Sequence, residues 1–227
     1  MTTDDSNGQI VAKMVAVIPG RVLQGVFGLV GVLRPAAKPL HPSGRLRASV
    51  IERHGLEGTA ATGVEWIDRP GTTEALVRMS RATGLPESLP DIRGMAIRIP
   101  AAPDGPADLL LASTGLGRFS RFILVPSFAA SGCAYSTLLP YRTDNGPILI
   151  AACPDPADPD RFELACAAPR GPWRAFADLQ LGRDIGTGDE SLSFDPILHQ
   201  LPRLDCYPWA AQLREGAYRA ARWSRNR

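Results

Sequence analysis

The residues best suited to chemistry lie near the C-terminus, in a stretch whose Ala, Leu, Arg and Glu content is typical of a helix. Residues three or four positions apart share a helix face, and this spacing links four of the side chains: Arg214, Tyr218, Arg222 and Arg225. One face would then carry three guanidinium groups around one phenol. Adjacent cations favour the phenolate form of a tyrosine, and a phenolate can bind a ferric ion. The alternative is a terminal helix whose arginines face water and whose tyrosine packs on the core.

The composition predicts a globular protein with an unremarkable surface charge. The chain has 227 residues, of which 44% are hydrophobic and 21% charged, and its net charge is +2. A net charge this small gives no strong overall electrostatic attraction to nucleic acid or to membranes. Although the C-terminal arginines could face a phosphate backbone, the sequence contains no known nucleic-acid motif, so we expect no nucleic-acid partner.

The cysteine and histidine spacing argues against several site classes. The cysteines are never in C-x-x-C spacing, which argues against a zinc or iron–sulfur site and favours thiols in a reducing cytoplasm; they are Cys133, Cys153, Cys166 and Cys206. No P-loop, H-E-x-x-H, G-x-S-x-G or G-x-G-x-x-G motif occurs. Kinase, zincin and α/β-hydrolase functions therefore lack their usual anchors. His54 and His199 are interpreted as structural.

Residues 10–33 are strongly apolar, but Pro19, Gly20 and Arg21 interrupt them. Neither half reaches the roughly 20 apolar residues that a membrane span needs, and the preceding residues lack the basic start of a signal peptide. We predict two short helices that pack on the core or on a partner subunit of a homo-oligomer. A peripheral membrane contact through residues 10–33 is the alternative.

After a Pro-rich segment the sequence becomes strand-like. Short apolar or alternating runs, separated by Gly, Pro and Asp clusters, occur at residues 47–53, 75–79, 94–99, 108–113, 135–141, 148–153, 161–167 and 175–181. Many short strands with turns between them predict an antiparallel barrel or sandwich. We expect an N-terminal helical arm at residues 1–37 and a single β domain at residues 38–227 that ends in the basic helix.

Five stretches, taken in order, resemble the haem-binding core of catalases. They are K-P-L-H-P-S-G at 38–44 with the strand after it, V-R-M-S at 77–80, D-I-R-G-M-A-I-R-I at 91–99, the segment 108–128 ending in L-V-P-S-F, and R-E-G-A-Y at 214–218. The resemblance implies an α+β, mainly β fold: a catalase-like antiparallel β-barrel with N-terminal helices and a C-terminal haem-ligating helix. A chain of this length has no room for the long arms and C-terminal domain of full-length catalases.

The resemblance implies a role for each matched residue. His41 stands at the position of the distal catalytic histidine, and Ser80 at that of the serine that orients its ring. Tyr218 matches the axial ligand of the haem b iron, and Arg214 matches the arginine that keeps it a phenolate. Arg222 shares the helix face with them and is a further candidate for binding the haem, since a forked guanidinium suits a propionate. The positions that bind the haem propionates are occupied by Lys38, Arg78 and Arg225.

Other positions depart from the family. Ala112 stands where catalases have the distal asparagine, and bulky pocket phenylalanines are replaced by Gly117, Arg118 and Val125. Losing a positioned hydrogen bond of this kind costs on the order of 10²–10³ in rate. We therefore expect a haem peroxidase or organic-hydroperoxide-directed oxidoreductase with weak or no true catalase activity. Its substrate would be a hydroperoxide or another small apolar molecule.

Two other function classes stay open. The first is a non-catalytic carrier of haem or of an apolar ligand on the same barrel, which the loss of the distal asparagine motivates. The second is a phosphodiesterase-type hydrolase, which ranks lower because the sequence shows no two-metal ligand set.

Overall fold

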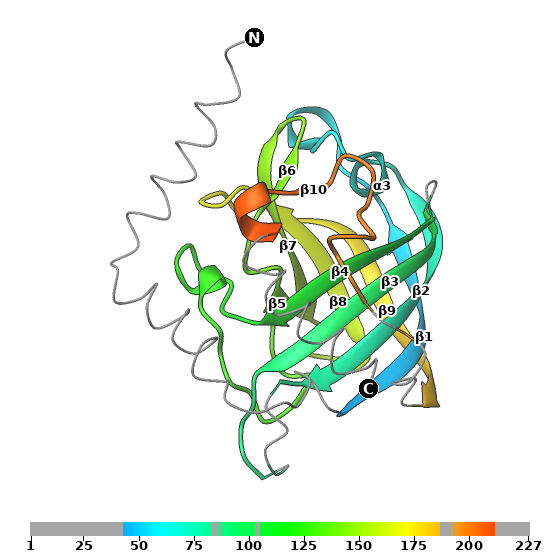
Figure 1. Cartoon of the computed structure of the whole chain (residues 1–227), viewed down its shortest axis with the longest axis vertical. Helices are drawn as coiled ribbons and strands as arrows, with labels where there is room; N and C mark the ends of the chain where they lie inside the picture. The colour runs from blue at the N-terminus through cyan, green and yellow to red at the C-terminus, as the bar shows by residue number, and fades with distance from the viewer. Residues whose placement is uncertain are drawn as a thin grey trace. The chain divides into compact units, whose positions relative to one another are not determined.

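A computed structural model describes residues 43–82, 86, 88–102, 105–186, 192 and 194–211. The fold of these residues is mainly β (Figure 1). In chain order the elements are β1 (Ser43–Arg53), the 3-10 turn η1 (Gly58–Ala60), α3 (Glu65–Asp68), β2 (Gly71–Arg81), β3 (Arg93–Ala102), β4 (Gly105–Ser113), η2 (Ser120–Phe122), β5 (Tyr135–Ser136), β6 (Tyr141–Thr143), β7 (Gly146–Pro154), β8 (Arg161–Ala167), β9 (Arg174–Gly186) and β10 (Asp205–Cys206). A helical turn at residues 208–211 ends the described part.

Seven of the eight predicted strand segments lie within single strands, and β8 has the predicted bounds of 161–167. The prediction of one strand at 135–141 was wrong, because that stretch contains the short strands β5 and β6 with a break between them. In the break, Leu138 has a φ of 58°. A branched side chain rarely adopts such a left-handed backbone, and the conformation cannot continue a strand. Pro140 then removes a backbone donor.

Antiparallel pairing closes eight of the strands into a barrel. The strand order is β10-β6-β7-β5-β4-β3-β2-β1-β9-β8, and an additional pairing between β7 and β8 completes the circle. Strand β7 is the junction, because β5 and β6 pair with its two ends on one edge and β8 pairs along its other edge. Strands β6 and β10 therefore form a small extension outside the closed barrel.

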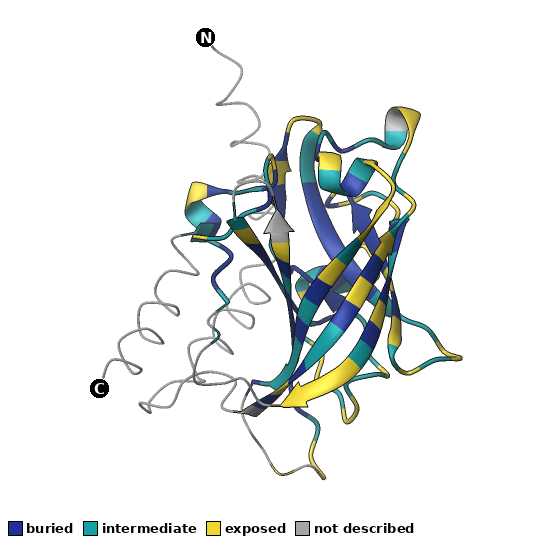
Figure 2. Cartoon of the chain, turned by 90° about the vertical axis from the view of Figure 1, so that its right-hand side faces the viewer, coloured by how far each residue is buried: buried dark blue, intermediate teal, exposed yellow. Residues whose placement is uncertain are grey.

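The barrel interior is filled by large apolar side chains from alternate positions of the strands. Ile51, Val77 and Ile97 face inward and are fully buried, as are Phe162 and Leu164 on the other side of the barrel. Buried and exposed residues alternate along the strands accordingly (Figure 2). The interior is thus a packed core, and ligands have to be sought on the outer face or at the ends of the barrel.

The contact between β1 and β9 requires a glycine. A Cβ atom on Gly182 would collide with the backbone carbonyl oxygen of Ala48 on β1. The register shifts at this point of the pairing, and Arg47 donates from Nε to the carbonyl oxygen of Gly182 at 2.6 Å. A bulge with close backbone approach is a common way for a small barrel to bend its strands.

The predicted N-terminal arm (1–37), the domain division after it, and the predicted haem-ligating helix beyond residue 211 all lie outside the described residues. Within the part of the chain that is described, no helix has the length and apolar character needed to cross a bilayer.

Candidate functional site

A row of small residues crosses the outer face of the barrel. The row consists of successive cross-strand partners on β1 to β5: Gly44, Ser80, Gly94, Ala112 and Ser136. As cross-strand partners these residues share one side of the sheet, and it is the outer side, because Met95, Leu111 and Tyr135, which alternate with three of them, belong to the inner core. Gly44, Gly94 and Ser136 are nevertheless buried, and Ala112 is half-buried. A flat group can approach a sheet closely only where the side chains are this short.

Arg78 and Ser80 lie two residues apart on β2 and face outward together, as their predicted shared role requires. The Arg78 guanidinium lies against Gly44, since a Cβ built there would be 2.6 Å from Arg78 Cζ. Gly44 therefore leaves the space that this guanidinium occupies. Ser80 donates from its hydroxyl to the carbonyl oxygen of Gly94 at 3.4 Å, a long hydrogen bond. Whether either residue serves a cofactor stays a prediction.

The other predicted site residues lie outside the described part of the chain. These are Lys38 and His41 before β1, and Arg214, Tyr218, Arg222 and Arg225 after the last described turn. Strand β1 begins at Ser43, two residues after His41. The predicted distal histidine is thus separated by two positions from the strand that carries Gly44.

The hydroxyl groups beside Ala112 are already engaged in the structure. Ser113 donates to the carbonyl oxygen of Val125 at 2.7 Å and accepts from the backbone N–H of Arg93 at 3.0 Å. Ser136 donates to the carbonyl oxygen of Arg121 at 3.1 Å and accepts from Thr114 at 2.9 Å. These two hydroxyls therefore brace the barrel end.

The remaining departures from the catalase pattern lie on the loop between β4 and β5. Gly117 and Arg118 are exposed just before η2, and Val125 is exposed after it. Ser120 accepts the backbone N–H of Gly117 through its hydroxyl at 3.0 Å, which tightens the turn. None of these three residues is buried where a pocket wall would need it, so these described positions form an open edge rather than an enclosed distal chamber.

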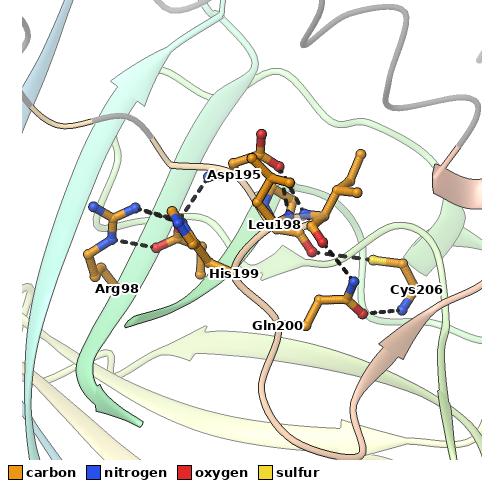
Figure 3. A network of polar contacts seen from close by, with 9 residues as sticks. Arg98, Asp195, Leu198, His199, Gln200 and Cys206 are labelled. Atoms are coloured by element: carbon orange, nitrogen blue, oxygen red, sulfur yellow. Dashed lines mark hydrogen bonds and ion pairs between the residues drawn. The ribbon is translucent and has the colours of Figure 1, made fainter. Parts of the chain in front are cut away.

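A polar network that the sequence did not suggest lies further along the same face (Figure 3). Arg98 on β3 and Asp108 on β4 are direct cross-strand partners, joined by two hydrogen bonds of 2.7 and 2.6 Å. The Asp108 carboxylate is fully buried and the Arg98 side chain is 11% exposed. A parallel pair of bonds between a guanidinium and a carboxylate is among the strongest polar contacts in proteins.

His199 joins this pair from a distant part of the chain. Its Nδ1 lies 2.9 Å from Asp108 Oδ2 and 3.2 Å from Arg98 Nη2. The donor and acceptor roles of Nδ1 in these two contacts depend on the tautomer of the imidazole ring, because a carboxylate only accepts and a guanidinium only donates. The backbone N–H of Asp108 also donates to the carbonyl oxygen of His199 at 2.9 Å. His199 was interpreted as structural, but its particular role could not be predicted. It connects β4 to the segment after β9.

The fastened segment, residues 194–206, is held by further bonds, and we call it the strap. The backbone N–H of Asp195 donates to Asp108 Oδ2 at 2.8 Å, and the Arg98 guanidinium lies 5.0 Å from the Phe194 ring centroid. Gln200 accepts the backbone N–H of Cys206 at 2.9 Å and so closes the far end of the strap. The strap leads into the helical turn at residues 208–211, where the described part of the chain ends.

We call the cluster of Arg98, Asp108 and His199 the clamp. A signal in the sequence could have identified part of it. Arg98 and Asp108 are single charges inside apolar strands, and a charge in such a position needs a partner. Neighbouring strands with one cation and one anion suggest that the two pair. No local sequence pattern indicates that His199 joins this pair, because it lies 91 residues from Asp108 in the sequence.

The described residues hold no group of three or more His, Cys, Asp or Glu side chains that could bind a metal ion. A haem iron needs only one axial protein ligand, so this observation does not bear on Tyr218. All four cysteines lie among the described residues, and none forms a disulfide. Burial in the core raises the pKa of the Cys166 thiol to about 11, which disfavours its reactive thiolate.

Comparisons with known proteins support the fold alone. No protein-family model matches the chain, and no curated protein matches its sequence. Among solved structures, the chain is similar to one described as the crystal structure of a fungal catalase, with a TM-score of 0.60 and 13% sequence identity. The match covers 89% of this chain and 62% of that one, so the chain spans less than two thirds of the catalase it matches. The similarity is consistent with the closed eight-stranded antiparallel barrel found here.

Proposed function

We propose that the protein binds haem b on the outer face of β1–β5 and acts as a catalase-like peroxidase on organic hydroperoxides. The observation that carries this proposal is the row of small residues on that face, with Arg78 and Ser80 beside it. Two residues before β1 stands His41, the predicted proton carrier. The fold similarity to a catalase supports the same assignment.

The residues of the row fit a flat, apolar macrocycle. Gly44, Gly94 and Ala112 present no side chain longer than a methyl group, and Leu46 and Ala96 add apolar surface that is 7% and 8% exposed although it faces outward. A guanidinium at the margin, as Arg78 provides, suits a propionate because of its forked donors. Tyr218 would supply the axial phenolate, with Arg214 favouring its ionised form.

The chain's own residues would divide the chemistry between them. Bound haem would supply an iron centre at which a peroxide O–O bond can be broken, and an organic reducing co-substrate would supply the two electrons that this reduction needs. His41 would take the proton from the bound hydroperoxide and return it to the leaving oxygen, and Ser80 would hold the ring in position. Ala112 gives no hydrogen bond to orient a small peroxide, while it leaves space for an organic substituent. This favours organic hydroperoxides over hydrogen peroxide.

A second function has an observation in its favour. The hydroxyl groups of Ser113 and Ser136 beside Ala112 are already engaged in hydrogen bonds within the barrel. A face with so few available donors also suits a carrier of haem or of another flat apolar ligand, without chemistry. The two functions share the same binding face and differ in the need for His41.

An optical spectrum of the purified full-length protein, with haem added, tests the binding function. We expect a Soret band with the features of a high-spin ferric tyrosinate, and the loss of those features in Tyr218→Phe. A protein that stays colourless after haem addition contradicts the peroxidase and the haem carrier, and leaves only a carrier of another flat apolar ligand.

Turnover of cumene hydroperoxide by the haem-loaded protein separates the two functions. A peroxidase loses on the order of 10²-fold or more of its rate in His41→Ala with haem still bound. Haem binding with no turnover supports the carrier function, whereas turnover that His41→Ala leaves unchanged contradicts the catalytic role of His41.

A further inference from the structure

The loop between β4 and β5 exposes an unusual density of large apolar side chains. Phe119 is 81% exposed and Phe128 68%, while Ile123 and Val125 are 39% and 40% exposed. Half of the exposed large hydrophobic side chains found in the described residues thus fall within ten positions of one loop. Leu89 on the β2–β3 loop, at 46% exposure, is a fifth. We call these five residues the apolar loop patch.

Backbone pairing brings the members of the patch onto one side of the loop. Ile123 and Val125 are two residues apart in an extended segment, so their side chains point the same way. Leu124 between them pairs with Thr114 at the end of β4. The bridge between Asp91 and Ser127 places the β2–β3 loop, with Leu89, beside the end of this segment. The stretch from 123 to 128 is about 16 Å long at the usual strand rise.

Polar contacts beneath the loop keep its shape without the help of the patch. Arg121 is buried, donates to the carbonyl oxygens of Gly117 and Ala168 at 3.2 Å each, and stacks on Trp173 at 4.5 Å. Trp173 in turn donates to the carbonyl oxygen of Leu116 at 2.8 Å. At the other end, Arg93 donates to the carbonyl oxygens of Ser127 and Phe128. The Arg121 guanidinium of this loop thus points inward while several of its large apolar side chains are exposed, the reverse of an ordinary surface loop.

The charge of the loop indicates the kind of surface it would meet. Residues 114–134 contain two arginines and no acidic residue. Arg118 is exposed next to Phe119. The nearby Asp91 is fully buried and paired with Arg81 at 3.5 Å, so it does not offset this charge at the surface. Aromatic and aliphatic side chains with a cation at their margin match the boundary between lipid headgroups and acyl chains.

We propose that the apolar loop patch docks the protein onto an anionic lipid surface. Phe119, Phe128 and their aliphatic neighbours would enter the headgroup region, and Arg118 would contact the lipid phosphates. The loop does this as a preformed support, because Arg121 and Arg93 hold its backbone in place. The proposal goes beyond haem binding and does not depend on it.

Vesicle flotation of the purified full-length protein tests the docking. We expect binding to vesicles of phosphatidylcholine and phosphatidylglycerol at 3:1, and weaker binding to phosphatidylcholine alone. The double variant Phe119→Ser/Phe128→Ser should lower the partition coefficient at least about tenfold, because two large apolar side chains no longer enter the lipid. Leu198→Ser is the matched control, since Leu198 is 69% exposed on the strap, on a different element, and its loss should change nothing.

Several results would overturn the proposal. These are a wild-type protein that stays unbound, binding that does not depend on the anionic lipid, and a double variant that binds like the wild type, in which case another segment such as residues 10–33 makes the contact. Sedimentation velocity tests the remaining alternative, in which a second copy of the chain occupies the patch. If the wild type forms a dimer that the double variant does not form, and neither binds vesicles, a second copy of the chain covers the patch.

Discussion

Two regions of one barrel face, on the same two strands, are built in opposite ways. Around Gly94 and Ala112 the outer side of β3 and β4 carries almost no side chain, and four residues further along each strand, about 13 Å away, Arg98 and Asp108 form a buried ion pair. The clamp fills its surface with the chain's own strap. The row of small residues has only short side chains of its own, so that a flat group can approach the sheet closely there. The region around Arg98 and Asp108 thus stabilises the fold, whereas the region around Gly94 and Ala112 suits the binding of a ligand.

The largest expected effect comes from breaking the clamp. Asp108→Asn removes the charge that balances the buried Arg98, and breaking a buried pair in this way costs about 3 kcal/mol of unfolding free energy. Urea denaturation measures the loss. The exposed pair of Arg142 on β6 and Asp205 on the strap, at 3.1 Å, is the matched control, and Asp205→Asn should cost less than about 1 kcal/mol. Equal losses in the two variants would show that the clamp is no more than a surface contact.

Filling the row of small residues is expected to give the next largest effect. Ala112→Leu adds bulk where a flat ligand would lie, and overpacking of about 1–3 kcal/mol corresponds to roughly a five- to hundredfold loss of affinity. Haem titration followed at the Soret band measures the affinity, and circular dichroism checks the fold. Gln180→Leu, on the exposed outer side of β9, serves as the control and should bind haem normally. Unchanged haem affinity in Ala112→Leu would place the ligand elsewhere.

A smaller effect is expected at the margin of the row. Arg78→Lys keeps the charge but loses the fork that suits a propionate, and the loss of one charge-assisted hydrogen bond lowers haem affinity roughly tenfold. A porphyrin ester without propionate charges provides the comparison. It should bind the wild type and Arg78→Lys equally well. If the ester discriminates between them as haem does, Arg78 acts through packing on Gly44 and not through a carboxylate.

The smallest effect concerns local opening of the strap. Gln200→Ala removes the acceptor of the Cys206 backbone N–H, a bond of 2.9 Å, and a net loss of about 1 kcal/mol should speed native-state labelling of Cys206 about fivefold. Peptide mapping by mass spectrometry measures the label at pH 8. Cys166 is the internal control, because burial raises its thiol pKa to about 11 and little thiolate exists at that pH. Faster labelling of both thiols would indicate global unfolding and not an opened strap.

Much of the barrel could be predicted from the sequence, and the candidate site only in part. The alternation in residues 161–167 predicted β8 with its true bounds, since inward and outward residues repeat every two positions. Arg78 and Ser80 were predicted to share a site, and the structure places both on the outer side of β2. The predicted partners His41 and Tyr218 lie outside the described residues, so their roles remain predictions.

The sequence by itself determined the strands, their inward and outward sides and the residues available for chemistry, because these depend on short windows of side-chain pattern. Only the tertiary structure decided that β7 and β8 close the barrel, that residues 135–141 break at Leu138, and that His199 reaches Asp108. These features depend on contacts between segments far apart in the chain. Such contacts stabilise the protein only once the barrel has assembled, so no short window of sequence can predict them.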